Sequence, residues 1–119
     1  MRELLMINSI LTSIKKALGI EEEYIHFDPD IIMHINSAFF TLNQLGVGPE
    51  EPFMIEDKSS EWSDFIYTGR IEMVKTYIYM VVRRAFDPPS NSAYLNSLNE
   101  MIKEYEWRMN VQVDPDNGE

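Results

Sequence analysis

The sequence contains no cysteine, which excludes disulfide bonds and thiolate metal sites and makes a cytosolic environment the simpler expectation. It has no apolar run near the roughly 20 residues that a membrane-spanning helix needs. Its N-terminal stretch is broken by polar residues from Asn8 onward, so it predicts a helix rather than a signal peptide. Basic residues are also scarce, since ten lysines and arginines face twenty acidic residues, a net charge of −10. Such a chain is not expected to grip a nucleic-acid backbone, which requires clustered positive charge.

Recognisable catalytic, metal-binding and phosphate-binding motifs are missing as well. The two histidines, His26 and His34, match no common zinc spacing, and the C-terminal DPDNGE stretch lacks the glutamate that a calcium loop requires. No serine has a plausible histidine base, and no glycine-rich phosphate-binding pattern occurs. We therefore expect no catalytic centre, no cofactor and no metal.

What the sequence does contain is helical periodicity, strongest around a central stretch. Apolar residues recur from Ile71 to Phe86 on so much of the circumference that this helix should be packed on several sides. Its predicted inward face comprises Ile71, Val74, Ile78, Val81 and Ala85. The Asp87-Pro88-Pro89 sequence should end it, because proline disfavours helical conformation in the residue before it.

Three further helices and one short helix are expected around it. The first should run from about Glu3 to Leu18, and the second should start with Asp28 as N-cap and end before Gly46. Ser59 or Ser60 should cap a short helix over residues 61–66, whose buried side is Trp62, Phe65 and Ile66. The last helix follows the capping cluster 90–92, with an apolar stripe at Leu95, Leu98, Ile102, Tyr105 and Met109. The chain is thus predicted to be a single all-α domain, a small bundle of four to five helices with a flexible tail over residues 112–119.

Residues 46–60 form the longest irregular segment, and their acidity has two interpretations. Six acidic residues and one lysine fall between positions 50 and 64. An acidic balance often serves only solubility, but it also suits a surface past which DNA slides without sticking. Phe53 and Ile55 alternate as in a short strand with inward side chains. Long loops in compact domains are more often functional than accidental.

Five motifs are spread along the chain. They are Asp28 followed by His34-Ile35-Asn36, then LNQLGVGP over residues 42–49, WSDF over 62–65, FDPP over 86–89 and EWRMNV over 106–111. In combination they resemble the head–tail connector (adaptor) proteins of tailed bacteriophages and prophages. The resemblance covers roughly residues 10 to 112, so positions 1–9 lie outside it. Its candidate structural signature comprises Asp28, Asn36, Gly46, Trp62, Phe86, Pro88, Pro89, Trp107 and Arg108.

The resemblance implies a subunit without enzymatic activity that forms a homo-oligomeric ring under the portal protein at the virion neck. Its other implied partner is a tail completion or stopper protein, and DNA passes nearby without sequence-specific binding. No membrane is involved, and the chain would reside in the host cytoplasm before assembly. The candidate interface or channel loop then carries Glu50, Glu51, Phe53, Glu56 and Asp57. The alternative is a non-enzymatic, acidic helical protein that binds or regulates a partner, and an enzyme ranks third.

Overall fold

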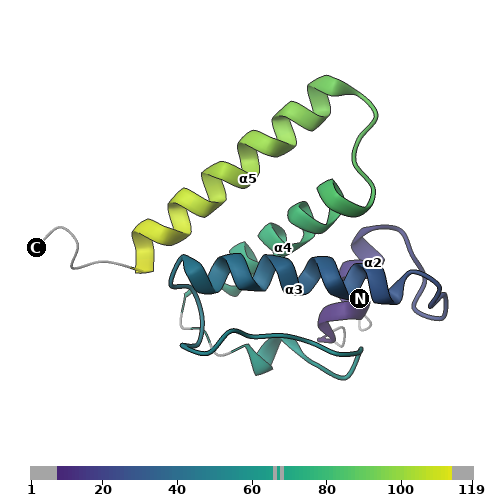
Figure 1. The fold of residues 1–119 in the computed structure, drawn as a ribbon, viewed down its shortest axis with the longest axis horizontal. Helices are drawn as coiled ribbons and strands as arrows, with labels where there is room; N and C mark the ends of the chain where they lie inside the picture. The colour runs from purple at the N-terminus through teal and green to yellow at the C-terminus, as the bar shows by residue number, and fades with distance from the viewer. Residues whose placement is uncertain (1–7, 66, 68, 114–119) are drawn as a thin grey trace, which may run out of the picture.

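The helix α4 (Ile71–Phe86) contacts every other α-helix described in the computed structural model of this chain. The structure describes residues 8–65, 67 and 69–113 (Figure 1). The elements around α4 are α2 (Ile10–Ala17), α3 (Asp28–Gln44), the 3-10 turn η1 (Trp62–Asp64) and α5 (Ser92–Val113). No strand occurs within those ranges, where pairing is limited to one isolated bridge between Ser9 and Glu61. The predicted all-α bundle is therefore confirmed.

The buried face of α4 consists of Val74, Tyr77, Ile78, Met80 and Val82. This confirms a central helix that ends before Asp87 and carries Arg83 and Arg84 in its last turn. Ala85, expected on the buried face, is exposed instead. At this last turn Phe86, rather than Ala85, reaches the start of α3, and its ring meets that of Phe27 edge-on at 5.2 Å between centroids.

Helix α2 begins later than predicted, because Ser9 is its N-cap. The Ser9 hydroxyl accepts a hydrogen bond from the Thr12 amide at 3.2 Å, and its own backbone is extended. The extended segment pairs with the chain before η1, since the Ile10 amide donates to the Ser60 carbonyl at 3.0 Å and the Trp62 amide donates to the Asn8 carbonyl at 2.9 Å. Asn8 and Ser9 are thus not helical, and the rest of the predicted first helix before them lies outside the described residues.

Helix α3 has the predicted length of 17 residues, but Asp28 is its first residue and not its N-cap. Phe27 occupies the cap position, where its side chain has no oxygen to accept a hydrogen bond, and the Asp28 carboxylate forms an ion pair with Lys15 instead. The C-terminal end matches expectation. Gly46 adopts a φ of 83°, and the next amide, of Val47, returns to the Leu42 carbonyl at 2.8 Å, which is the Schellman arrangement that favours glycine.

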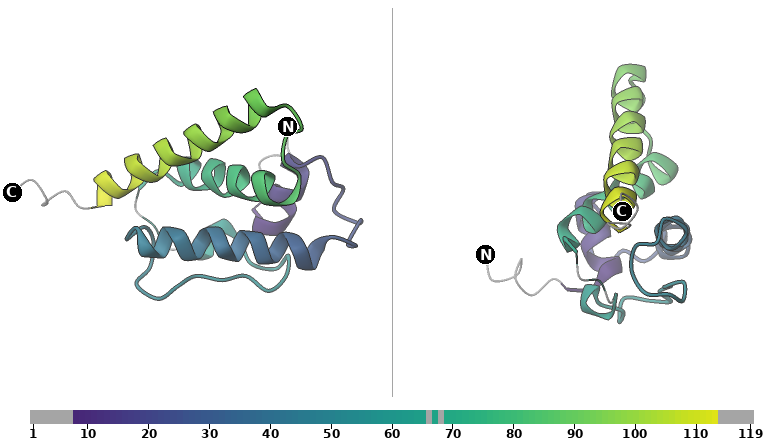
Figure 2. Two further views of the ribbon diagram at one scale, coloured as in Figure 1. Left: turned by 45° about the horizontal axis from the view of Figure 1, so that its top comes forward. Right: turned by 90° about the vertical axis from the view of Figure 1, so that its left-hand side faces the viewer.

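The segment 46–60 then runs back beside α3 toward α2, which Figure 2 shows from two further sides. Ile55 is buried and Phe53 half-buried, as their alternation predicted, but the segment is not a strand. Gly48 permits its closest approach to the core, because a Cβ there would lie 2.5 Å from the ring of Phe65. The turn η1 is capped by Glu61, whose amide donates to the Asp64 carboxylate at 2.8 Å, and not by the predicted Ser59 or Ser60. Trp62 and Phe65 are buried as expected, whereas Ile66 lies outside the described residues.

Helix α5 is the outermost helix and packs chiefly on α4. Asn91, in the predicted capping cluster, accepts hydrogen bonds from the amides of Ala93 and Tyr94 at 2.8 and 3.1 Å. The predicted stripe faces inward, with Ile102 and Met109 buried and Leu95, Leu98 and Tyr105 half-buried. The helix continues to Val113, two residues into the segment expected to be a tail, and the remainder of that tail lies outside the described residues.

Candidate interaction surfaces

The irregular segment 46–60 is held against α3 by two asparagines spaced two helical turns apart. The Asn36 amide group accepts from the Ile55 amide at 2.8 Å and donates to the Ile55 carbonyl at 3.0 Å. Asn43 donates to the carbonyls of Glu50 and Pro49 at 3.1 and 3.4 Å. Asn36 therefore supplies the pair of hydrogen bonds that a neighbouring strand would otherwise supply, which fixes the loop without a sheet.

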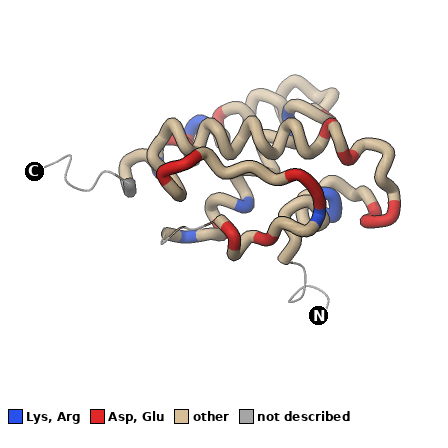
Figure 3. The backbone as a smooth tube through the Cα atoms, turned by 60° about the horizontal axis from the view of Figure 1, so that its bottom comes forward, with Lys and Arg blue, Asp and Glu red and all other residues tan. Residues whose placement is uncertain are grey.

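Four of the five candidate loop residues point to solvent. Glu50, Glu51, Glu56 and Asp57 are exposed, and Figure 3 shows acidic positions at both ends of this loop and on the linker between α2 and α3. Asp57 accepts hydrogen bonds from the hydroxyl and amide of Ser59, and these lower the pKa of its carboxyl. Phe53 points inward instead, with its ring edge-on to those of Phe39 and Phe65 at 4.9 and 5.4 Å. The accessible part of the loop therefore comprises its carboxylates together with Pro52, Met54, Lys58 and Ser59.

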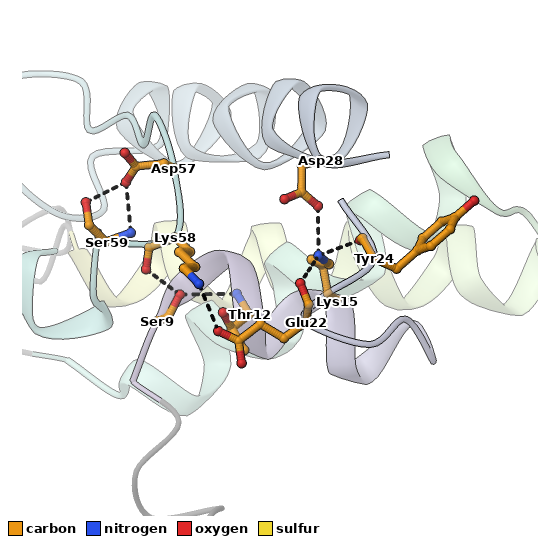
Figure 4. Close-up of polar contacts among 9 residues, drawn as sticks. All are labelled: Ser9, Thr12, Lys15, Glu22, Tyr24, Asp28, Asp57, Lys58 and Ser59. Atoms are coloured by element: carbon orange, nitrogen blue, oxygen red, sulfur yellow. Dashed lines mark hydrogen bonds and ion pairs between the residues drawn. The ribbon is translucent and has the colours of Figure 1, made fainter. Parts of the chain in front are cut away.

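Asp28 of the candidate signature forms a buried ion pair with Lys15. The Lys15 ammonium lies 2.8 Å from Asp28 Oδ1 and donates to the carbonyls of Glu22 and Tyr24 at 3.0 and 2.8 Å (Figure 4). The Lys15 side chain is only 2% exposed. From the sequence alone, Lys15 is only a basic residue in the last turns of the first helix, where the helix dipole favours positive charge. Its three oxygen partners lie 7 to 13 residues further on in the chain, where no periodicity reveals them.

Most other signature residues shape the core. Trp62 is buried and its indole donates to the Ser13 hydroxyl at 2.9 Å, Phe86 packs on Phe27, and Gly46 ends α3. Pro88 and Pro89 follow the end of α4 and lead into α5.

Trp107 and Arg108 differ from the rest of the signature, because both lie on the surface of α5. Trp107 is 67% exposed, and Arg108 forms an exposed ion pair with Glu104. Together with Arg70, Met73 and Val111, these two residues line a groove of about 380 Å³ between the start of α4 and the end of α5. Arg70 and Met73 were not singled out from the sequence, and only their place near a helix end could have suggested them.

No chemical centre emerges from the described residues. Within them, no group of three or more histidine, aspartate or glutamate side chains is placed to hold a metal ion. No helix in the described ranges combines the length and the apolarity needed to cross a membrane. The features that stand out are instead exposed carboxylates and exposed aromatic and aliphatic side chains.

The comparison with protein families identifies the family of this chain. The model of the family described as "Phage connector protein" matches residues 10–116. Because the match covers most of the sequence, the chain belongs to the phage connector protein family, and its role is that of a connector in a phage. The match begins at the first residue of α2, in line with the resemblance seen in the sequence. Comparisons with curated proteins and with solved structures found no match.

Proposed function

We propose that the chain is a structural subunit of the virion neck that assembles with copies of itself into a ring beneath the portal protein. The ring extends the channel through which DNA passes and offers a platform to a tail completion or stopper protein. Subunits wait in the host cytoplasm before assembly, and the chain has no catalytic activity of its own. Family membership over residues 10–116 is the observation that carries this proposal.

The distribution of charge supports a position beside DNA. A net charge of −10 on 119 residues repels a phosphate backbone, so DNA can pass without being held. The carboxylates of Glu50, Glu51, Glu56 and Asp57 are exposed on a loop that is fixed to α3, which keeps them at the surface. These residues would therefore line the channel or face a neighbouring subunit.

The same charge opposes assembly, which makes the proposal testable with salt. Subunits of a closed ring of identical copies touch through heterologous contacts, and like charges must then come together. Repulsion between exposed charges is screened over about 10 Å at 0.1 M salt. We expect monomers at low salt and low protein concentration, and rings as either rises, most readily on the portal.

Sedimentation velocity across a salt series, with and without the cognate portal, measures this directly, and electron microscopy of the mixture shows whether rings form. Replacing Glu50, Glu51, Glu56 and Asp57 together by glutamine should move assembly to lower salt. Replacing three exposed acidic residues outside the loop, Glu72, Asp87 and Glu100, by their amides is the control. If the chain stays monomeric even with its portal, the ring proposal is wrong and the partner-binding alternative takes its place.

A further inference from the structure

The two ends of the molecule each expose large apolar side chains, and the charges around them have opposite sign. One end is the linker between α2 and α3, where Tyr24 and Ile25 are 51% and 67% exposed; we call residues 21–25 together with Asp30 the Tyr24 ledge. The other end is the groove lined by Arg70, Met73, Trp107, Arg108 and Val111, which we call the Trp107 groove. Neither exposed apolar set contributes to the core, so each is available to a partner.

The Trp107 groove combines an exposed aromatic side chain with positive charge, in a chain whose net charge is −10. Trp107 and Val111 are 67% and 50% exposed, and the guanidinium groups of Arg70 and Arg108 flank them. The contact between Arg108 and Glu104 is an exposed pair within one helix, worth only a few tenths of a kcal/mol, so Arg108 can exchange it for another carboxylate. Tryptophan and arginine are the residues most enriched at interface hot spots.

The Tyr24 ledge is rigid although it is irregular. The buried Lys15 ammonium binds the Glu22 and Tyr24 carbonyls, so the backbone is fixed directly beneath the exposed side chains (Figure 4). A surface ion pair of Glu22 with Lys58 at 3.3 Å adds a link to the loop 46–60. A ledge held in this way presents Tyr24 and Ile25 without an ordering cost on binding.

The two surfaces lie at opposite ends of α3, which sets the symmetry of any contact between them. The ledge leads directly into Asp28, while the Leu45 carbonyl after α3 accepts a hydrogen bond from Asn110 of α5 at 3.2 Å, next to the groove. The 17 residues of α3 separate them by roughly 25 Å. Figures 1 and 2 show the linker and the end of α5 on opposite sides of the molecule.

We infer that the Trp107 groove of one subunit binds the Tyr24 ledge of a second copy of this chain. The inference rests on the proposed function, because two different surfaces at opposite ends make a heterologous contact that propagates from copy to copy, and such a contact forms a ring when the rotation between copies closes. Tyr24 and Ile25 fill the apolar groove, and Arg70 and Arg108 meet Glu21, Glu23 and Asp30, all exposed. Apolar burial supplies the affinity, and the charge pairs fix which ends meet.

A charge exchange tests this contact. The variant R70E/R108E reverses the groove, and E21K/E23K/D30K reverses the three ledge carboxylates that meet the arginines while leaving Glu22 with Lys58. Each variant alone should sediment as a monomer under conditions in which the wild-type chain oligomerises, because its groove and ledge then carry the same sign. An equimolar mixture should restore oligomers that contain both variants, since each reversed groove meets a reversed ledge. R83E/R84E, a charge-matched change at the opposite end of α4 from Arg70, is the control and should assemble like the wild type.

A second variant separates apolar contact from charge. W107A should raise the concentration needed for half-assembly by roughly 10-fold or more, as expected for an interface hot spot. Y94A, which removes an equally exposed aromatic (71%) from the other end of α5, should change it less than about 2-fold. Circular dichroism confirms that each variant is folded.

The outcomes distinguish this inference from the proposed function. Wild-type chain that never oligomerises, even with its portal, refutes the proposed function and the contact together. Rings from R70E/R108E alone, or a mixture that fails to rescue assembly, overturn the contact and leave the ring standing. Variants that form free rings normally but no longer bind the portal also overturn it, since the groove would then serve the portal instead of a second copy.

Discussion

The irregular loop 46–60 is better anchored than the longest helix of the molecule. The loop buries Val47 and Ile55, half-buries Phe53 and is hydrogen-bonded to α3 by Asn36 and Asn43. Helix α5 spans 22 residues, yet within its described side chains it buries only Ile102 and Met109 fully. Regular backbone structure and attachment to the core are thus separate properties. The loop owes its position to the folded subunit, whereas α5 leaves most of its circumference for other contacts.

The largest effect is expected on α4, the helix that contacts both α3 and α5. Ile78 of this helix is completely buried, so Ile78→Ala leaves a cavity in the core. It should lower the free energy of unfolding by about 2–5 kcal/mol, as buried large-to-small substitutions do. Chemical denaturation of the subunit measures the change. An unaltered midpoint would mean that this face of α4 is not the core of the bundle.

The anchoring of the loop comes next in size. Asn36→Ala deletes two hydrogen bonds and leaves the amide and carbonyl of the buried Ile55 without them, which should cost about 2 kcal/mol. Limited proteolysis should also cut the loop faster. Asn96→Ala, an exposed position on α5, is the matched control and should change stability by less than about 0.5 kcal/mol. Equal effects of the two substitutions would show that Asn36 does not hold the loop.

A smaller effect is expected for the polar link between α4 and α5. The hydroxyl of Tyr77 donates to Glu106 at 2.7 Å, so Tyr77→Phe should cost about 1 kcal/mol at neutral pH. Burial first, and then the bond to Glu106, raise the pKa of Tyr77. Its contribution is complete below the unfolded pKa of about 10 and is lost as the pH rises above that value. The free energy of unfolding, measured by denaturation at several pH values between 8 and 11, should therefore decrease less with rising pH for Tyr77→Phe than for the wild type.

The smallest effect on the subunit is expected for Trp107→Ala. Because this side chain is mostly exposed, its loss should change the free energy of unfolding by less than about 0.5 kcal/mol. Thermal denaturation of the monomer measures it, with Met109→Ala on the buried side of α5 as the contrasting variant. A large loss of stability would mean that Trp107 contributes to folding. The exposed side of α5, with Trp107, would then not differ from the buried side, with Met109.

The regular elements were predictable because their signals are local. The apolar spacing from Ile71 to Phe86, the glycine after α3 and the 3-4-3-4 stripe from Leu95 to Met109 all indicate structure through neighbours a few residues away. Contacts between distant segments were not predictable in this way. In the sequence, Asn36 resembles any polar residue of a helix. Nothing near it indicates that its side chain forms hydrogen bonds with the backbone of Ile55, 19 positions further on.

The candidate surfaces show the same division. The exposed carboxylates of the loop could be expected from their density in the sequence, and the inward turn of Phe53 from its alternation with Ile55. The partners of the Phe53 ring, Phe39 and Phe65, could not be expected, because they lie in other segments of the chain. Asp28 resembles a helix cap in sequence, and only the folded arrangement places the Lys15 ammonium beside it. Trp107 was selected as part of a motif, and only the structure shows that it lies outside the core.

The uneven attachment of α5 along its length has a consequence for how fast its amides exchange with solvent. The second half of the helix is held by the Tyr77–Glu106 and Asn110–Leu45 hydrogen bonds and buries Ile102 and Met109. The first half has the hydrogen bond between Arg84 and Asn99 at 3.1 Å and only half-buries Leu95 and Leu98. Local opening follows the number of buried contacts that must break. Amides from Asn96 to Asn99 should therefore exchange hydrogen for deuterium earlier than those from Ile102 to Met109, so that α5 opens from the end nearest Pro89.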